Sequence, residues 1–319
     1  MNSSVESGIC IPFTESFENR LLIKVEDPAV FVFGVFEERS EIDEDWLNIF
    51  GEDGVFELRP ESDLYSVAIP RFREQSISMR NQVDVGKFIE YLGNRTIYLD
   101  ITGLPHHIWM PLLRVGIESG AKINCVYVEP KSYTFSPAPK PGEFFNLSDR
   151  LHGFQPIPTF ARLIARRADE LTLVPLLGFE GIRFRHLIER LEPSERNINP
   201  VVGVPGFEPE YPFHTFEGNA TVLSETRSWQ RVGYVDASCP FSLTHHLTRI
   251  ADQMDGKSLQ IATIGTKPHA LGAALYAIAN PTTEIIYDHP VRKKSRTSGA
   301  TRCHLYMVSD FLERQSNEA

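Results

Sequence analysis

The chain has 319 residues, 42% hydrophobic and 23% charged, with a formal net charge of −10 at pH 7. This composition is that of an ordinary globular protein, and it excludes disordered, collagen-like and coiled-coil classes. The negative charge disfavours a protein whose main work is to coat nucleic acid or an anionic membrane, so no general nucleic-acid binding is expected.

Three further features bound the class of protein. The longest apolar runs, at about 29–36 and 271–279, are less than half of what a membrane span needs, so no membrane partner is predicted. The first residues carry neither the basic nor the apolar region of a secretory signal, which predicts a cytoplasmic address. The four cysteines lie far apart without a C-x-x-C pair, which predicts reduced, mostly buried thiols and no metal site: Cys10, Cys125, Cys239 and Cys303.

Along the chain, short β-branched or aromatic runs alternate with segments of helical period. Strands are expected at about 30–35, 64–69, 96–101, 123–128, 171–177, 198–204, 231–237, 259–264, 284–288 and 304–308, and helices at about 41–50, 83–92, 106–119, 182–191, 240–254 and 268–279. Strands that are apolar throughout are typical of a parallel sheet covered by helices on both faces. We therefore predict an α/β protein with one or two Rossmann-like, mostly parallel sheets.

The predicted organisation has two similar halves. An N-terminal Rossmann-like half is expected over 1–150 and a C-terminal half over 160–319, joined by a proline-rich connection at Lys131 to Thr159. A second irregular stretch is expected from Pro205 to about Trp229. The loops at 102–106 and 265–269 share a start in glycine, proline and histidine, which fits gene duplication and convergent turn chemistry equally well.

The strongest candidate site is the loop that precedes the helix at 268–279. It combines the permissive Gly265, the Thr266 hydroxyl, the cation of Lys267 and His269 at a helix N-terminus. Main-chain N–H groups, the helix dipole and a full positive charge attract phosphate, so this loop is a candidate phosphate site. The alternative is a tight turn whose lysine points to solvent.

A basic run follows the next strand. Arg292, Lys293 and Arg296 belong to a segment with four cations in five positions, followed by Ser298 and Gly299. A flexible loop of this kind can fold over phosphates held at Gly265. The alternative is a solvated charge run, which is the usual fate of such segments.

Further candidates lie at the ends of other strands. Thr102 and Gly103 follow one strand, and Arg183 lies in the first turn of a helix, where a cation is favoured only by a nearby anion. Pairing with Glu180 or Glu189 would explain Arg183 without a ligand. Asp100 and Asp236 each end an apolar strand, where they are candidate catalytic acids or bases or ribose ligands. As caps of the following helices they need no function.

The segments Leu99-Asp100-Ile101-Thr102-Gly103 and Ile264-Gly265-Thr266-Lys267-Pro268 resemble the strand-to-helix loops of CRISPR-associated Rossmann fold (CARF) and related SAVED sensor domains. In those families a similar turn before an alanine-rich helix helps to hold a cyclic oligonucleotide. The resemblance implies a nucleotide-sensing role in bacterial antiviral defence, with the effector on a separate protein chain.

Three functional hypotheses remain open at this stage. The first is a sensor or adaptor that binds a nucleotide, an oligonucleotide or another phosphate-bearing small ligand. The second is an enzyme that acts on a nucleotide or a sugar phosphate, with Asp100 or Asp236 as acid or base. The third is a non-catalytic structural subunit of a larger complex. No cofactor is predicted, and a homo-oligomer is compatible with each hypothesis.

Overall fold

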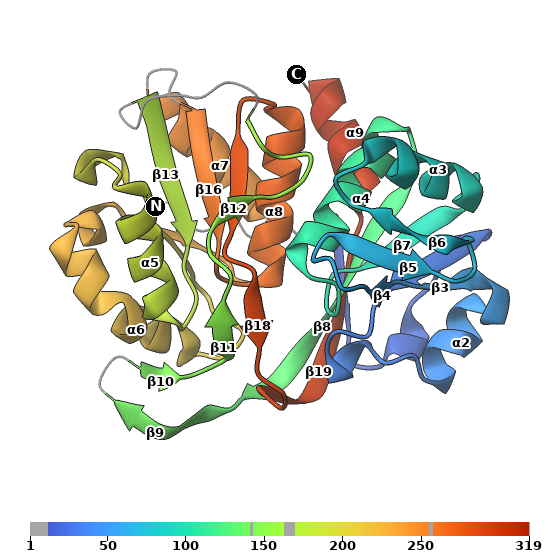
Figure 1. Ribbon diagram of the computed structural model, residues 1–319, viewed down its shortest axis with the longest axis horizontal. Coiled ribbons are helices and arrows are strands. Elements are labelled where there is room, and N and C mark those ends of the chain that lie inside the picture. The colour runs from blue at the N-terminus through green and yellow to red at the C-terminus, as the bar shows by residue number, and fades with distance from the viewer. Residues whose placement is uncertain (1–11, 141–142, 163–169, 255–257, 319) are drawn as a thin grey trace. The chain divides into compact units, whose positions relative to one another are not determined.

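The computed structural model describes residues 12–140, 143–162, 170–254 and 258–318 (Figure 1). Its contacts divide the described chain into two compact units. The central unit comprises the described residues of 132–298, and the terminal unit comprises 12–131 together with 299–318. Each unit contains one six-stranded sheet and its own helices, so the protein is a mixed α/β protein with two mostly parallel sheets.

The units do not follow the expected halves at 1–150 and 160–319. The N-terminal portion of the terminal unit ends at Lys131, and residues 299–318 return to this unit from the far end of the chain. The physical reason is strand pairing, because β19 (Thr297–Tyr306) lies between β1 (Thr14–Phe17) and β8 (Ile123–Tyr133). A strand inside a sheet cannot be separated from it without loss of its hydrogen bonds.

The sheet of the terminal unit has the order β1-β19-β8-β7-β2-β3. The pairs formed by β2 (Ala29–Phe33) with β3 (Val55–Glu57), β2 with β7 (Thr96–Asp100) and β7 with β8 are parallel, and β1 pairs with β19 in the antiparallel sense. A small antiparallel sheet contains β4 (Arg59–Pro60), β5 (Ser66–Ile69) and β6 (Arg73–Ser78). The helices are α2 (Glu44–Phe50), α3 (Gln82–Leu92), α4 (His106–Glu118) and α9 (Val308–Glu318).

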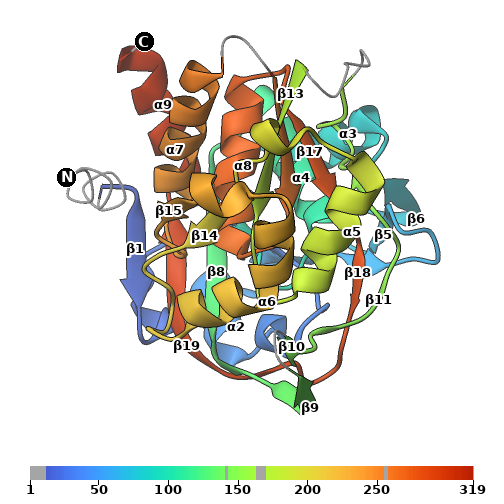
Figure 2. The same ribbon diagram turned by 90° about the vertical axis from the view of Figure 1, so that its left-hand side faces the viewer.

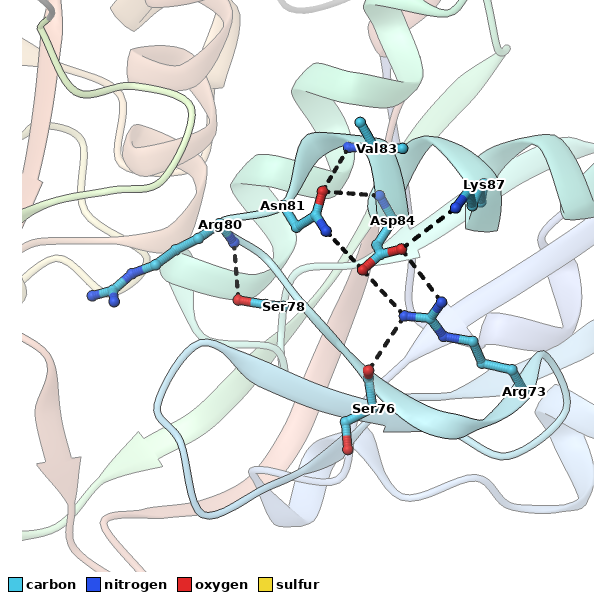
Figure 3. Close-up of polar contacts among 8 residues, drawn as sticks. All are labelled: Arg73, Ser76, Ser78, Arg80, Asn81, Val83, Asp84 and Lys87. Atoms are coloured by element: carbon cyan, nitrogen blue, oxygen red, sulfur yellow. Dashed lines mark hydrogen bonds and ion pairs between the residues drawn. The ribbon is translucent and has the colours of Figure 1, made fainter.

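Local chemistry explains where α3 begins, as Figure 3 shows. The Asn81 side-chain oxygen accepts hydrogen bonds from the main-chain N–H groups of Val83 and Asp84, and its amide nitrogen donates to the Asp84 carboxylate. Asp84 also pairs with Arg73 at 3.3 Å and with Lys87 at 3.9 Å. An asparagine cap followed by a carboxylate in the first turn satisfies helix donors and complements the helix dipole.

The sheet of the central unit has the order β12-β17-β16-β13-β14-β15. Its parallel strands are β13 (Leu171–Leu176), β14 (Val201–Gly203), β15 (Gly233–Val235), β16 (Ser258–Thr263) and β17 (Glu284–Tyr287), and β12 (Gln155–Pro156) pairs antiparallel with β17. Two short pairs complete the unit: β9 (Phe135–Lys140) with β10 (Glu143–Phe145), and β11 (Ser148–Leu151) with β18 (Pro290–Arg292). Figure 2 shows the helices of this unit gathered around the sheet: α5 (Gly181–Leu191), α6 (Tyr211–Glu225), α7 (Pro240–Gln253) and α8 (Lys267–Ala279).

The core of the central unit forms between the sheet and two of these helices. Phe184 and Leu187 of α5 and Val222 and Leu223 of α6 pack on buried residues of β13, β14 and β16. Helix α8 packs against α7, since the Thr244 hydroxyl donates to the Gly272 carbonyl oxygen at 3.0 Å. Right-handed crossovers place α5 and α6 on one face of the sheet and α7 and α8 on the other.

Several sequence expectations are corrected by the structure. The segment 205–229, expected to be irregular, contains helix α6, and the connection at 131–159 contains β9, β10, β11 and β12. The strand expected at 64–69 belongs to the small antiparallel sheet. Cys125 and Cys303 are free and buried, but Cys239 is disulfide-bonded, which corrects the expectation of a reduced thiol there. Cys10 lies outside the described residues.

Candidate functional site

The candidate site lies in the central unit at the carboxyl ends of β13 and β16. From β13 the chain proceeds to β14 and β15 on one side, and then returns to add β16 and β17 on the other side, so the strand order reverses between β13 and β16. In open parallel sheets, ligands bind outside the carboxyl ends of the strands at such a reversal. The loops that leave these two strands carry Gly178 and Gly265.

The two glycines allow their loops to meet. A Cβ atom on Gly265 would lie 2.7 Å from the Leu177 carbonyl oxygen, and a Cβ atom on Gly178 would lie 2.7 Å from the Ile264 carbonyl oxygen. Real Cβ atoms do not approach backbone so closely, so both positions require glycine. The sequence pattern identified Gly265 for its permissive backbone, and the structure shows that close packing is the actual constraint.

An inner cavity of about 100 Å³ opens at this meeting point. Four of the sequence-predicted residues line it together: Arg183, Gly265, Thr266 and Arg296. Its remaining walls come from the ends of neighbouring strands and from aromatic side chains: Tyr133, Leu147, Leu177, Gly178, Phe179, Glu180, Gly203, Gly206, Phe207, Tyr211, Thr215, Ala237 and Ile264. The loops after β13 and β16 and the basic segment near 296 therefore converge on one cavity.

An outer cavity of about 910 Å³ adjoins the inner one, because Phe179, Glu180 and Arg183 line both. Its walls are mostly polar and come from 145–155 and from helix α5, where His186 and Arg190 lie. Ligand pockets usually measure about 300–1,000 Å³. The outer cavity is thus large enough for a small organic ligand, and the inner one for a single compact group such as a phosphate.

Thr266 and the start of α8 form one wall of the inner cavity. Thr266 is the N-cap of α8: its hydroxyl accepts from the His269 main-chain N–H at 3.3 Å and donates to the Ala237 carbonyl oxygen at 3.0 Å. These bonds fix the helix start against the loop that follows β15. The positive end of the α8 dipole consequently lies beside the cavity, where it favours an anion.

Arg183 lies beneath the site in a buried ion pair. Its guanidinium donates two hydrogen bonds to the Asp288 carboxylate, at 2.6 and 2.7 Å, and a third to the Ile264 carbonyl oxygen at 3.0 Å. Burial by itself would lower the pKa of Arg183, but the charge and hydrogen bonds of Asp288 outweigh it and the net shift is upward. The partner of Arg183 is thus Asp288, not Glu180 or Glu189 as one sequence interpretation had it.

Glu180 fixes the wall that the two cavities share. Its carboxylate accepts from the main-chain N–H groups of Leu147 and Ser148 at 2.8 and 2.9 Å, and from the Ser148 hydroxyl at 2.8 Å. These three bonds hold the start of β11 against the loop before α5. The sequence suggested Glu180 only as a partner of Arg183. The hydrogen bonds of Glu180 bridge 32 or 33 residues, a separation that no local pattern reveals.

Aromatic side chains form a second wall that the sequence analysis missed. The ring of Phe179 stacks on Phe145 with centroids 4.4 Å apart, and meets Tyr211 and Tyr133 edge to face at 5.2 and 5.3 Å. Burial raises the pKa of Tyr211 to about 12, so its hydroxyl stays neutral at physiological pH. Tyr211 belongs to helix α6, which the sequence analysis had expected to be irregular, and this explains why the wall was not foreseen.

Other predicted ligand residues lie elsewhere. Lys267 is only 9% exposed and does not line either cavity. His269 is fully buried with Nε2 2.9 Å from the Asp236 carbonyl oxygen, and burial lowers its pKa. Arg292 lies in β18 opposite Ser148, and the Lys293 main-chain N–H donates to the Leu147 carbonyl oxygen at 3.0 Å.

The basic segment is therefore not the flexible loop that the sequence suggested. It passes from β18 through a turn into β19, and the Thr134 main-chain N–H donates to the Arg296 carbonyl oxygen at 2.9 Å. The Thr134 hydroxyl donates to the Ser295 carbonyl oxygen at 2.8 Å. Backbone hydrogen bonds on both sides hold Arg296 at the cavity wall.

The two aspartates proposed as acids or bases are engaged in turns. Asp236 accepts from the main-chain N–H and hydroxyl of Ser238 at 2.8 and 2.7 Å. Asp100 accepts from the main-chain N–H groups of Thr102 and Gly103 at 2.8 and 3.1 Å. These bonds lie within tight turns, and neither aspartate caps the following helix as the alternative interpretation expected, because the N-cap residues are Pro105 for α4 and Cys239 for α7. Neither aspartate lines the inner or the outer cavity.

Thr102 and Gly103 belong to the terminal unit and do not join this site. The Thr102 hydroxyl accepts from the Val128 main-chain N–H at 2.8 Å. A Cβ atom on Gly103 would lie 2.1 Å from the Gly34 carbonyl oxygen and 2.4 Å from Ser40 Oγ. In the terminal unit, the strand order reverses between β2 and β7, and Gly103 allows the loops that follow these two strands to pack closely there.

Comparison with known proteins adds no family. No protein-family model matches the chain, and no curated protein matches it in sequence at a significant level. Within the described ranges, no helix is long and apolar enough to cross a membrane. In the same part of the chain, histidine, cysteine, aspartate and glutamate form no cluster of three that could hold a metal ion.

Proposed function

We propose that the central unit binds a nucleotide or an oligonucleotide at the reversal of strand order, as a Rossmann-like sensor or adaptor. The observation that carries this proposal is the convergence of Gly265, Thr266, Arg183 and Arg296 on one small cavity at the start of α8. A glycine-containing loop, the positive end of a helix dipole and a cationic side chain are the groups that phosphate recognition needs.

The two cavities divide the ligand into two parts. The inner cavity, at about 100 Å³, takes a phosphate, and Arg296 supplies the positive charge because the charge of Arg183 is balanced by Asp288. The outer cavity, at about 910 Å³, takes the remainder of the ligand. Phe179 lines both cavities and, with Phe145, gives their junction an aromatic wall beside which a base can lie.

Binding has more support than turnover. The enzyme hypothesis named Asp100 and Asp236 as acid or base, and both carboxylates are engaged in turn hydrogen bonds away from the cavities. The resemblance of Ile264 to Pro268 to CARF and SAVED loops supports a sensory role in antiviral defence, with the effector on a separate chain. These observations support the proposal of a receptor that holds a nucleotide and passes the signal to a partner.

Calorimetric titration with ATP as the probe tests the proposal. Arg296→Ala should weaken ATP binding about 10- to 100-fold, the scale of a lost charge-assisted hydrogen bond of about 1.5–3 kcal/mol. The matched control is Lys294→Ala, which removes the same charge from an exposed side chain two residues away that does not line the cavity.

The control should bind ATP as the wild type does, within about twofold. Equal affinity of the Arg296→Ala and wild-type proteins would contradict the assignment of the inner cavity. If both substitutions weakened ATP binding equally, the loss of affinity would come from long-range attraction between exposed charges and not from a contact in the inner cavity.

A further inference from the structure

A serine, a histidine and a glutamate form a hydrogen-bonded chain in the terminal unit, in no sequence motif and outside the proposed nucleotide site. Ser16 Oγ lies 2.8 Å from His304 Nδ1, and His304 Nε2 lies 3.2 Å from Glu129 Oε2. The three residues come from β1, β19 and β8, which are successive neighbours in the sheet. Nucleophile, base and carboxylate follow one another as in the triads that activate a serine in hydrolases, with the two ring nitrogens of the histidine exchanged.

The register of the strands makes this arrangement specific. Ser16 and His304 are direct partners across the β1–β19 pair. The Met307 main-chain N–H donates to the Phe13 carbonyl oxygen at 2.9 Å, so every second pair from Phe13 is a hydrogen-bonded pair. Ser16 and His304 therefore form a pair of the other kind, whose side chains approach most closely.

The same alternation gives the serine an oxyanion donor. Residues in the pairs that are not hydrogen-bonded direct their own N–H groups away from the partner strand. Because β1 is the outermost strand of its sheet among the described residues, the Ser16 main-chain N–H points to the outer edge of the sheet and not toward β19. The main-chain N–H of the nucleophile is one of the donors that stabilise an oxyanion in acyl transfer.

Burial separates the roles of the three side chains. Ser16 is exposed, whereas His304 and Glu129 are only 5% and 6% exposed. The rings of Tyr127 and Tyr306 stack on the His304 ring with centroids 6.2 and 6.1 Å away, which holds the imidazole in its plane. The nucleophile is accessible to a substrate, while the base and its carboxylate are held in a site of low polarity.

We propose that Ser16, His304 and Glu129 form a second reactive site, which transfers an acyl group from an uncharged carboxylic ester. Two exposed glutamates flank the serine: Glu15 lies on β1, and Glu18 directly follows this strand. Their negative charges disfavour an anionic ester. In this site His304 Nε2 donates its proton to the Glu129 side chain. Nδ1 is then free of a proton and accepts one from the Ser16 hydroxyl.

The chemistry balances in two steps. Ser16 Oγ bonds to the carbonyl carbon while its proton passes to His304 Nδ1. The bond from carbon to the alkoxy oxygen then breaks, and the leaving alcohol takes that proton. Water attacks the acyl-serine, gives a proton to His304, and releases the carboxylic acid as the proton returns to Ser16 Oγ. No cofactor, metal or oxidant takes part.

A fluorophosphonate probe tests this site on the full-length wild-type chain. The Ser16 oxygen bonds to phosphorus, fluoride leaves, and the hydroxyl proton passes to His304. Peptide mapping by mass spectrometry should find the label on Ser16, with none on the same peptide of Ser16→Ala. His304→Gln and Glu129→Gln should each slow labelling about 100-fold or more, the scale of general-base catalysis.

Thr14→Ala is the matched control, because Thr14 lies on the same strand two residues away and pairs with Tyr306. It should be labelled at the wild-type rate and should hydrolyse p-nitrophenyl acetate as the wild type does. Circular dichroism checks that each variant is folded. Absence of label from wild-type Ser16 would overturn the proposal without recourse to any variant. Labelling of folded His304→Gln at the wild-type rate would overturn it equally.

Discussion

The buried pair of Arg183 and Asp288 provides the sharpest test of the structure beneath the candidate site. Arg183→Met removes the guanidinium and leaves the Asp288 carboxylate, which is 0% exposed, without its bidentate partner. The Ile264 carbonyl oxygen loses a donor as well. Removal of one partner of a buried ion pair typically costs about 3–5 kcal/mol of folding free energy, because the remaining charge stays away from water.

The double variant Arg183→Met/Asp288→Leu separates charge from packing. Without either charge, the buried volume is apolar, and such replacements are often close to neutral. We therefore expect the double variant to lose much less than the sum of the single variants, with a coupling free energy of about 2 kcal/mol or more. Urea unfolding at pH 7, followed by far-UV circular dichroism, measures all four proteins.

Arg185→Met is the matched control for this experiment. Arg185 lies two residues further along α5 and forms a surface pair with Glu225 at 3.1 Å, with both side chains more than one third exposed. Such pairs contribute about 0–1 kcal/mol. If Arg183→Met cost no more than Arg185→Met, or if the double variant lost the full sum, the claim of a dry, coupled pair would be refuted.

Two further predictions concern pH and glycine. Burial first, and then the charge of Arg249, lower the pKa of His246 to about 4, whereas the value in the unfolded chain is near 6.5. Between pH 6.5 and 4 the unfolded chain takes up a proton that the folded chain does not, so the free energy of unfolding should fall by about 3 kcal/mol. His246→Gln should flatten the pH dependence of urea unfolding, whereas replacement of the adjacent, exposed His245 by Gln should leave most of it in place, because His245 is the last and smallest of the causes that lower the pKa of His246. Gly86 lies inside α3 with open space at the Cβ position, so Gly86→Ala should raise stability by about 0.5–1 kcal/mol. Gly103→Ala should lower stability by about 1–3 kcal/mol, because the added Cβ meets the Gly34 carbonyl oxygen. Thermal unfolding of the two variants side by side checks the opposite signs.

The sequence predicted the regular elements where one local signal was strong. The helix expected at 268–279 is α8 (Lys267–Ala279), and the strand expected at 96–101 is β7 (Thr96–Asp100). Helix α6 lies in the stretch from Pro205 to about Trp229 that was expected to be irregular, and it begins with a proline in its first turn, where proline is well tolerated. The return of β19 to the first sheet was also missed, since strand order is set by pairing between residues far apart in sequence.

The candidate site was predictable where it depends on local sequence pattern, and not where it depends on contacts between distant residues. Gly265 and Thr266 follow a strand and begin a helix, so their place at a sheet edge follows from local pattern. Arg296 lines the cavity because it lies in the turn between β18 and β19, which the sequence did not predict. Glu180 and Tyr211 gained their positions from contacts across 33 and 78 residues, with Leu147 and Tyr133 respectively. The chain of Ser16 and His304 spans 288 residues, and no short motif can reveal it.

The most direct test of nucleotide binding at the inner cavity is mass spectrometry of the small molecules released from natively purified protein, for the wild type and for Arg296→Ala. We expect the wild type to release a phosphate-bearing nucleotide or oligonucleotide in a ratio approaching one per chain, and Arg296→Ala to release at most about one tenth as much. Wild-type protein that releases no such compound and binds no ATP on titration would contradict the account. An equal yield from Arg296→Ala would contradict the assigned site.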